Sequence, residues 1–143
     1  EVEIIKGKIS GSCGIECKWI LFSYGLLIIY GNGKMNDYKS TQLPEWNLYR
    51  NEIKKIRIGF GIKSIGNYAF YQLTNVEEIE ITNTVKTIES HAFDDCNSLR
   101  SLFIPNSVLS IKSYSISFCS NLETLILPES LQIIEQCRKF ERF

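Results

Sequence analysis

The sequence has little of what catalysis, nucleic-acid binding or membrane insertion requires. Its 143 residues include one histidine, His91, and its 16 basic residues balance 16 acidic ones, so the formal net charge is zero. Without a surplus of positive charge, we expect neither nucleic acid nor an anionic membrane surface as a partner. With 44% hydrophobic and 22% charged residues, the chain has the composition of one globular domain with a real core.

A long hydrophobic run is missing as well. The richest apolar stretch, residues 19–30, follows Lys18 and is interrupted by residues 23–25 (Ser-Tyr-Gly). It falls short of the roughly 18 residues of a membrane span, so we predict no membrane insertion and no signal peptide in this segment. Because the chain begins with Glu1 rather than methionine, we interpret it as a mature fragment or an excised domain.

One short phrase is repeated along the second half of the chain. Residues 65–70 (Ile-Gly-Asn-Tyr-Ala-Phe) return as residues 88–93 (Ile-Glu-Ser-His-Ala-Phe) and 111–116 (Ile-Lys-Ser-Tyr-Ser-Ile), and the isoleucine returns at Ile134. The spacing is constant, since 88 − 65, 111 − 88 and 134 − 111 all equal 23. A fixed period of roughly 20 to 50 residues is typical of a solenoid.

Five apolar columns obey the same period, which predicts that every coil turns the same set of side chains inward. They are Ile53, Val76, Leu99 and Leu122; Ile56, Ile79, Leu102 and Leu125; Ile58, Ile81, Ile104 and Leu127; Ile62, Val85, Val108 and Leu131; and Leu73, Cys96 and Cys119. Within one coil, residues 99–104 read as a strand and residues 105–107 (Pro-Asn-Ser) as a turn. No coil can bury its apolar face alone, so we expect the coils to stack with parallel strands about 4.8 Å apart.

The repeated phrase resembles a known family. The pattern Ile-Pro-Asn-Ser-Val-x-x-Ile-x-x-x-Ala-Phe-x-x-Cys-x-x-Leu-x-x-Leu, assembled from residues 81–127, is similar to the BspA-like, or Treponema-type, leucine-rich repeats. Residues 19–21, 31–38 and 44–46 resemble the leader that often precedes those repeats.

The resemblance implies a leucine-rich repeat solenoid. Such a solenoid has a parallel β-sheet on one face, short turns or helical turns on the other, and a small β-rich N-terminal cap. We accordingly assign residues 1–50 to the cap and residues 51–143 to about four coils, the last one degenerate. The resemblance also implies a cell-surface or secreted protein whose partner is a protein of the host, of a neighbouring cell or of the matrix, without naming that partner.

Five cysteines, Cys13, Cys17, Cys96, Cys119 and Cys137, cannot all pair within the chain. Cys96 and Cys119 share an inward column with Leu73, so we interpret them as buried free thiols. Cys13 and Cys17 flank three residues and could bridge across a turn in a secreted protein, or stay free. A metal site is not predicted, because Cys-x3-Cys has no second pair of ligands.

No catalytic arrangement can be assigned. His91 occupies a turn position that Tyr68 and Tyr114 occupy in the neighbouring coils, which predicts a surface or half-buried turn residue. Asp94 and Asp95 are adjacent, so their side chains should diverge. We therefore predict no enzyme, no catalytic residue and no cofactor.

The N-terminal part predicts β-structure with an unusual apolar content. Residues 2–9 suggest one opening strand that ends near Gly11, and residues 18–22 and 26–30 a hairpin that caps the first coil. Both faces of the hairpin are apolar, with Trp19, Leu21, Leu27 and Ile29 on one and Ile20, Phe22, Leu26, Ile28 and Tyr30 on the other. The second face is either an interface or is covered by residues 1–12 or 34–48.

Residues 35–49 show no clear period and suggest a long loop that leads into the first coil. Asp37, Tyr38, Trp46 and Tyr49 within or near this loop either pack against the core or line a crevice for a sugar or a peptide.

The outward positions of the predicted sheet are the candidate protein-binding site. Lys55 over Glu78 and Arg57 over Glu80 would place opposite charges on adjacent strands, which is also a purely structural arrangement. Phe103 beside Ile126 would add two exposed apolar side chains in register. The candidate site residues are Arg57, Glu80, Phe103 and Ile126.

The repeat decays at the C-terminus, where the Ala-Phe columns become Arg138 and Lys139. The charged residues Arg138, Lys139, Glu141 and Arg142 either form a cap over Phe140, or the boundary is truncated. In the second case residues 125–127 are left as an edge open to self-association. Two functions remain open: a non-enzymatic protein-binding or adhesion module that uses the strand face and turns, or a structural spacer or capping module within a longer repeat protein.

Overall fold

The computed structural model describes residues 3–5 and 8–135. Almost all of its regular structure is β-strand. In the N-terminal part the elements are β1 (Glu3–Ile5), β2 (Lys8–Ser12), β3 (Cys17–Phe22), β4 (Leu26–Gly31), β5 (Gly33–Lys34) and the 3-10 helix η1 (Glu45–Tyr49). The coils add β6 (Lys55–Ile58), β7 (Ile62–Ile65), β8 (Glu78–Ile81), β9 (Thr87–Ile88), β10 (Ser101–Phe103), β11 (Ser110–Ile111), β12 (Thr124–Ile126) and β13 (Ile133–Ile134).

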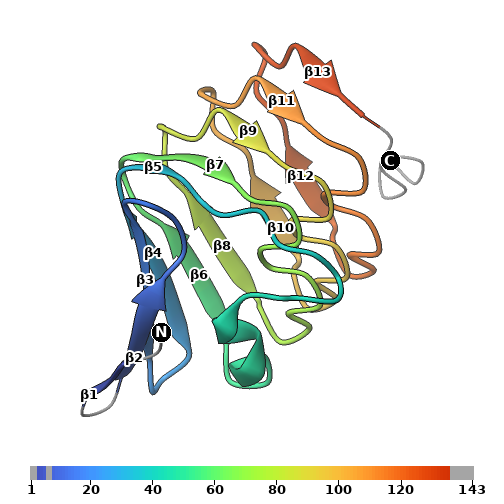
Figure 1. Cartoon of the computed structure of the whole chain (residues 1–143). Helices are drawn as coiled ribbons and strands as arrows, with labels where there is room; N and C mark the ends of the chain where they lie inside the picture. Colours follow the sequence, from blue (N-terminus) through green and yellow to red (C-terminus); the bar gives the residue numbers. More distant parts are fainter. Residues whose placement is uncertain (1–2, 6–7, 136–143) are drawn as a thin grey trace.

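The longer strands form the sheet that the repeat period predicts. In the order β1-β2-β3-β4-β6-β8, the pairs are antiparallel as far as β4 and parallel from β4 onwards. Strands β10 and β12 pair in parallel and follow β8 along the same side of the solenoid (Figure 1). Strand β4 of the hairpin therefore lies directly against β6, with Leu27 opposite Ile56.

A second parallel sheet closes the other side of each coil, in the order β13-β11-β9-β7-β5 (Figure 1). Sequence reasoning predicted only short apolar turns in these places. The strands are short, for example Thr87–Ile88 and Ser110–Ile111. Neighbouring strands of this sheet come from successive coils, as Ile88 opposite Ile111 shows. A two-residue strand carries no alternation that a pattern search could detect.

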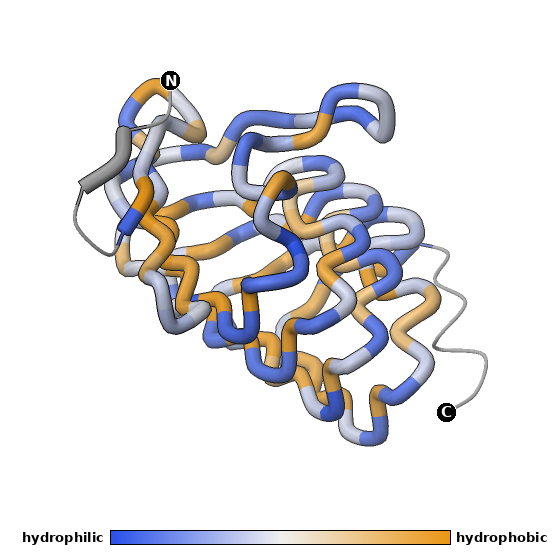
Figure 2. The backbone as a smooth tube through the Cα atoms, turned by 90° about the horizontal axis from the view of Figure 1, so that it is seen from below, coloured by the Kyte–Doolittle hydropathy of each residue, from blue (hydrophilic) through white to orange (hydrophobic). Residues whose placement is uncertain are grey.

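The core consists of the predicted inward columns. Members such as Ile53, Val76, Leu99 and Val108 have no exposed surface, and the predicted inward orientation of the columns is confirmed up to β12. Figure 2 shows how the hydrophobic stretches of successive coils lie next to one another along the solenoid. Ile134 departs from its column, because it is 45% exposed whereas Ile111 is fully buried.

An aromatic column runs along the axis of the solenoid. The ring of Trp46 stacks on Phe70 at 5.7 Å between centroids, and Phe70 stacks on Phe93 at 5.5 Å. The indole Nε1 of Trp46 donates a 2.8 Å hydrogen bond to the carbonyl of Ala69, so the polar atom of this buried residue is satisfied. Trp46 therefore packs in the core and anchors η1 there.

The N-terminal segment differs from the expected single opening strand. It contains two antiparallel strands, β1 and β2, with Ile4 opposite Ile9. The expected hairpin is confirmed as β3 and β4, which pair with Ile20 opposite Ile28. The predicted C-terminal cap, residues 138–142, lies outside the described residues.

Candidate functional site

The candidate site is the outward side of β4, β6, β8, β10 and β12, called the strand face here. Side chains alternate across a strand, so the residues between the buried positions point outward. The strand face comprises Leu26, Ile28, Tyr30, Lys55, Arg57, Glu78, Glu80, Ser101, Phe103, Thr124 and Ile126. The four predicted site residues lie in one row across it, on four strands in succession.

The middle of the strand face is a charged cluster, as the sequence predicts. Lys55 Nζ lies 3.2 Å from Glu78 Oε2 and 3.0 Å from Glu80 Oε1, and Arg57 Nε lies 3.7 Å from Glu80 Oε2. The hydrogen bond from Lys55 lowers the pKa of Glu80, and the same contact raises the pKa of Lys55. Two cations and two carboxylates therefore compensate each other, and the cluster presents little net charge to a partner.

The C-terminal end of the row is apolar. Phe103 and Ile126 are direct partners in the β10–β12 pair and are 58% and 50% exposed. The expected pair of exposed apolar side chains in register is therefore present.

The N-terminal end of the row is apolar too, and it is more extensive. Ile28 lies opposite Arg57 on one side and Ile20 on the other, so the row continues onto the hairpin. Tyr24 is 69% exposed and its ring stacks on Phe22 at 5.4 Å. We call the six residues Ile20, Phe22, Tyr24, Leu26, Ile28 and Tyr30 the apolar patch.

The apolar patch is not covered in the way that sequence reasoning allowed. Residues 8–12 form β2, which pairs edge to edge with β3 and does not lie over it. The second segment, residues 34–48, sends Trp46 against the opposite face of the hairpin, where its ring meets Trp19 edge to face at 5.7 Å. Within the patch, Tyr24 and Tyr30 are exposed, whereas Ile20, Phe22, Leu26 and Ile28 are half-buried.

A hollow of about 320 Å³ indents the strand face beside the charged cluster. Arg57, Gly59, Glu80 and Thr82 line it, and Phe60, which is 81% exposed, forms its rim. Such a hollow beside an exposed aromatic ring can receive one side chain of a bound protein.

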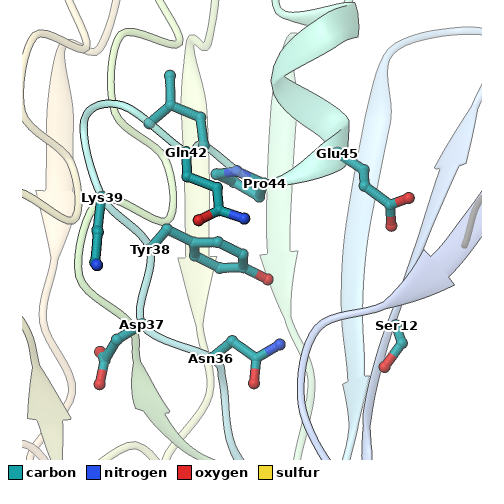
Figure 3. Close-up of a pocket in the computed structure, with 9 residues that line it drawn as sticks. Ser12, Asn36, Asp37, Tyr38, Lys39, Gln42, Pro44 and Glu45 are labelled. Carbon is teal, nitrogen blue, oxygen red and sulfur yellow. The ribbon is translucent and has the colours of Figure 1, made fainter.

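The four residues considered for a crevice are only partly brought together. Asp37 and Tyr38 line a hollow with Ser12, Asn36 and Glu45 (Figure 3). Trp46 is fully buried, and Tyr49 is partly buried, packs against the core and does not line this hollow. For these two residues the packing alternative is the one observed.

His91 belongs to a ladder of stacked rings at the turns. Its imidazole lies between Tyr68 and Tyr114, with centroids 4.5 and 5.3 Å away, and its Nδ1 lies 2.7 Å from Asp94 Oδ2. Burial raises the pKa of Asp94, and the contact with His91 works against that rise. All three ring residues have positive φ, near 60°, a backbone conformation that is uncommon for residues other than glycine. The 23-residue spacing of these three aromatic residues was the signal that could have predicted the stack.

The cysteines are buried thiols in the described part of the chain. Cys13, Cys17, Cys96 and Cys119 are present as buried thiols and not as disulfides, and Cys137 lies outside the described residues. A hydrogen bond with Cys17, together with burial, raises the pKa of the Cys13 thiol. No group of three metal-binding side chains occurs among the described residues, and no helix there is long and apolar enough to cross a membrane.

Stacked coils of 23 residues, parallel strands and columns of buried aliphatic residues define a leucine-rich repeat solenoid. The chain belongs to the BspA-type leucine-rich repeat family, because the family model for the BspA type leucine-rich repeat region matches residues 41–140 in six copies. The family resemblance and the fold that the sequence predicts are thereby confirmed.

Solved structures of bacterial leucine-rich repeat proteins share the fold. A leucine-rich repeat protein from Eubacterium ventriosum is 24% identical over 89% of this chain, with a TM-score of 0.69, and one from T. pallidum is 22% identical over 87%, with a TM-score of 0.60. A leucine-rich cell surface protein from Faecalibacterium prausnitzii is 20% identical over 94%, with a TM-score of 0.52. The chain spans 40%, 64% and 45% of the lengths of these proteins, respectively. The search of curated proteins finds no match.

Proposed function

We propose that this chain is a non-enzymatic protein-binding module of a cell-surface or secreted protein and that it binds through the strand face. The observation that carries the proposal is the distribution of apolar side chains. The Phe103–Ile126 pair is exposed at one end of the row, and at the other end Tyr24 and Tyr30 are exposed beside four half-buried apolar side chains of the patch. Exposed apolar residues gathered in this way are typical of a protein interface.

The charged cluster supports a role in orientation. Its charges already pair within the chain, so the cluster adds little attraction of its own, but a like charge placed over it would be repelled. We infer that the partner contacts the two apolar ends of the row, and that Arg57 and Glu80 set its register between them. The surface location rests on the family and on the name of the Faecalibacterium protein.

The test is binding of the intact chain to an immobilised panel of extracellular-matrix and cell-surface proteins. Ile28→Glu and Phe103→Glu each place a charge in an apolar end of the row, and we expect either to reduce binding at least about tenfold. Ile133→Glu is the matched control, since Ile133 is 48% exposed but belongs to β13 in the opposite sheet.

The outcome separates the two functions. Loss of binding in both strand-face variants, with unchanged thermal unfolding and an unaffected control, supports a binding module. If every bound protein tolerates both substitutions, the strand face is not the interface, and the spacer or capping function is favoured. Self-association through the C-terminal edge stays a prediction, which light scattering over a range of concentrations would test.

A further inference from the structure

A second hollow, of about 440 Å³, lies away from the strand face, between the end of β2 and the loop that leads to η1 (Figure 3). Ser12 forms one wall, and residues 36–39 and 42–45 form the others. The space is large enough for a small ligand, since ligand pockets occupy roughly 300 to 1,000 Å³.

The walls of this hollow are held in place by the first coil. The amide of Asn36 donates to the carbonyl of Cys13 at 2.6 Å, and the amide of Tyr38 donates to the carbonyl of Asn67 at 2.8 Å. Asp37 Oδ1 accepts the amide hydrogen of Asn67 at 2.9 Å. Gly66 is required beneath this segment, because a Cβ at that position would overlap the carbonyl of Asn36. The site is therefore preformed, which lowers the entropic cost of binding.

The side chains in the hollow combine an aromatic surface with groups that form hydrogen bonds. Tyr38 is half-buried, and its ring packs edge to face on Trp46 with 5.8 Å between the centroids, which fixes the ring. Its phenol interacts with Asn36, and burial raises its pKa, so the hydroxyl stays protonated and both donates and accepts. Glu45 provides a carboxylate in the wall of the same hollow.

This chemistry favours an uncharged ligand with several hydroxyl groups. Two carboxylates and one ammonium group line the hollow, on Asp37, Glu45 and Lys39, so an anion would meet net negative charge. The side-chain amides of Asn36 and Gln42 each offer hydrogen-bond donors and an acceptor, which match the hydroxyl groups of a sugar. The ring of Tyr38, which is partly exposed, provides an apolar surface for the C–H face of a sugar.

We propose that this hollow binds a neutral sugar unit, with Tyr38 against the ring and Asn36, Gln42 and Glu45 on its hydroxyls. The site shares no residue with the strand face, so either proposal can fail without the other. Sequence reasoning pointed to Asp37, Tyr38, Trp46 and Tyr49. Trp46 and Tyr49 do not line the hollow, and the structure places Asn36, Gln42 and Glu45 there instead.

The experiment is saturation-transfer NMR on the intact chain with glucose, galactose, mannose and N-acetylglucosamine as probes. The corresponding disaccharides form a second arm, which distinguishes a free sugar from a unit within a glycan. We expect at least one probe to bind with a Kd on the order of 1 mM, as suits a ligand of this size. Tyr38→Phe and Glu45→Gln should each weaken that binding. Because Glu45→Gln removes a charged group, it should raise the Kd by about tenfold.

Ser40→Ala is the matched control, because Ser40 is exposed in the same loop but does not line the hollow. Thermal unfolding of each variant checks that the loop still folds. The proposal is overturned if no probe shows saturation transfer at concentrations on the order of 10 mM. It is also overturned if the affinity for a bound sugar is unchanged by both substitutions. The same holds if an alkylamine, tested as a cationic probe, binds and no sugar does.

Discussion

The phenyl rings of Phe70 and Phe93 lie one coil apart and stack with 5.5 Å between their centroids and 11° between their planes. Both side chains are completely buried. Phe93→Ala should therefore lower the free energy of unfolding by about 3 to 5 kcal/mol, through lost burial and the cavity left behind. Urea denaturation measures this change, and a loss below about 1 kcal/mol would show that the column is not the core of the stack.

Thr84 ties one coil to the next through its hydroxyl. Its Oγ1 accepts the amide hydrogen of Gly61 at 3.0 Å and donates to the carbonyl of Ile62 at 2.8 Å, and both bonds are buried. Thr84→Val keeps the shape but leaves the Gly61 amide without this acceptor, so we expect a loss of about 1 to 3 kcal/mol. Thr84→Ser keeps the hydroxyl and should lose distinctly less in the same denaturation experiment. Equal losses in the two variants would assign the effect to packing.

The Lys55–Glu80 contact should make stability depend on pH. The pKa of Glu80 is lowered in the folded chain, so its contribution is present above the pKa of the unfolded chain and is lost as the pH falls through the folded pKa. Glu80→Gln should be slightly less stable than the wild type at pH 7, and the two should converge in acid. The difference should be small, because the pair is exposed, and smaller still at high salt. A difference in stability between the two proteins that persists unchanged in acid would contradict the assignment of this pH dependence to the Lys55–Glu80 contact.

The buried thiols should resist alkylation. Hydrogen bonding and burial raise the pKa of Cys13 and of Cys96, which keeps both protonated, and the thiolate is the reactive form. In the variant Cys137→Ser, iodoacetamide should modify the four remaining cysteines slowly in the native state and completely after unfolding without reductant. Mass spectrometry of peptides reads the result. If Cys13 and Cys17 stay unmodified in denaturant, they form the disulfide that the sequence also allowed.

The fold could largely be predicted from the sequence because the solenoid repeats one local rule. Each inward column is set by a 23-residue period, and parallel stacking follows from it, as Ile56 opposite Ile79 shows. The second sheet could not be predicted, because four of its five strands are two residues long and carry no detectable pattern. Trp46 was not recognised as the first ring of the aromatic column, since it lies 24 rather than 23 residues before Phe70.

The candidate site was predicted in part for the same reason. Register alone places Arg57 beside Glu80 and Phe103 beside Ile126, so the sequence could bring these residues together. The exposure of the apolar patch depends on the face of the β3–β4 hairpin against which the loop to η1 packs. That choice is made by the tertiary contacts of Trp46 with Trp19 and with the carbonyl of Ala69, which no local pattern encodes.

The change from antiparallel to parallel pairing at β4 gives the molecule a direction of growth. On one side of β4 the place of a further coil is taken by β3, which runs the opposite way and blocks parallel addition. On the other side each coil repeats the register of the previous one, with Lys55 opposite Glu78 and Ser101 opposite Thr124. Tandem duplication of a 23-residue unit can therefore lengthen such a protein beyond β4 while its starting end stays unchanged, so the apolar patch keeps its place at the origin of the array whatever the number of coils.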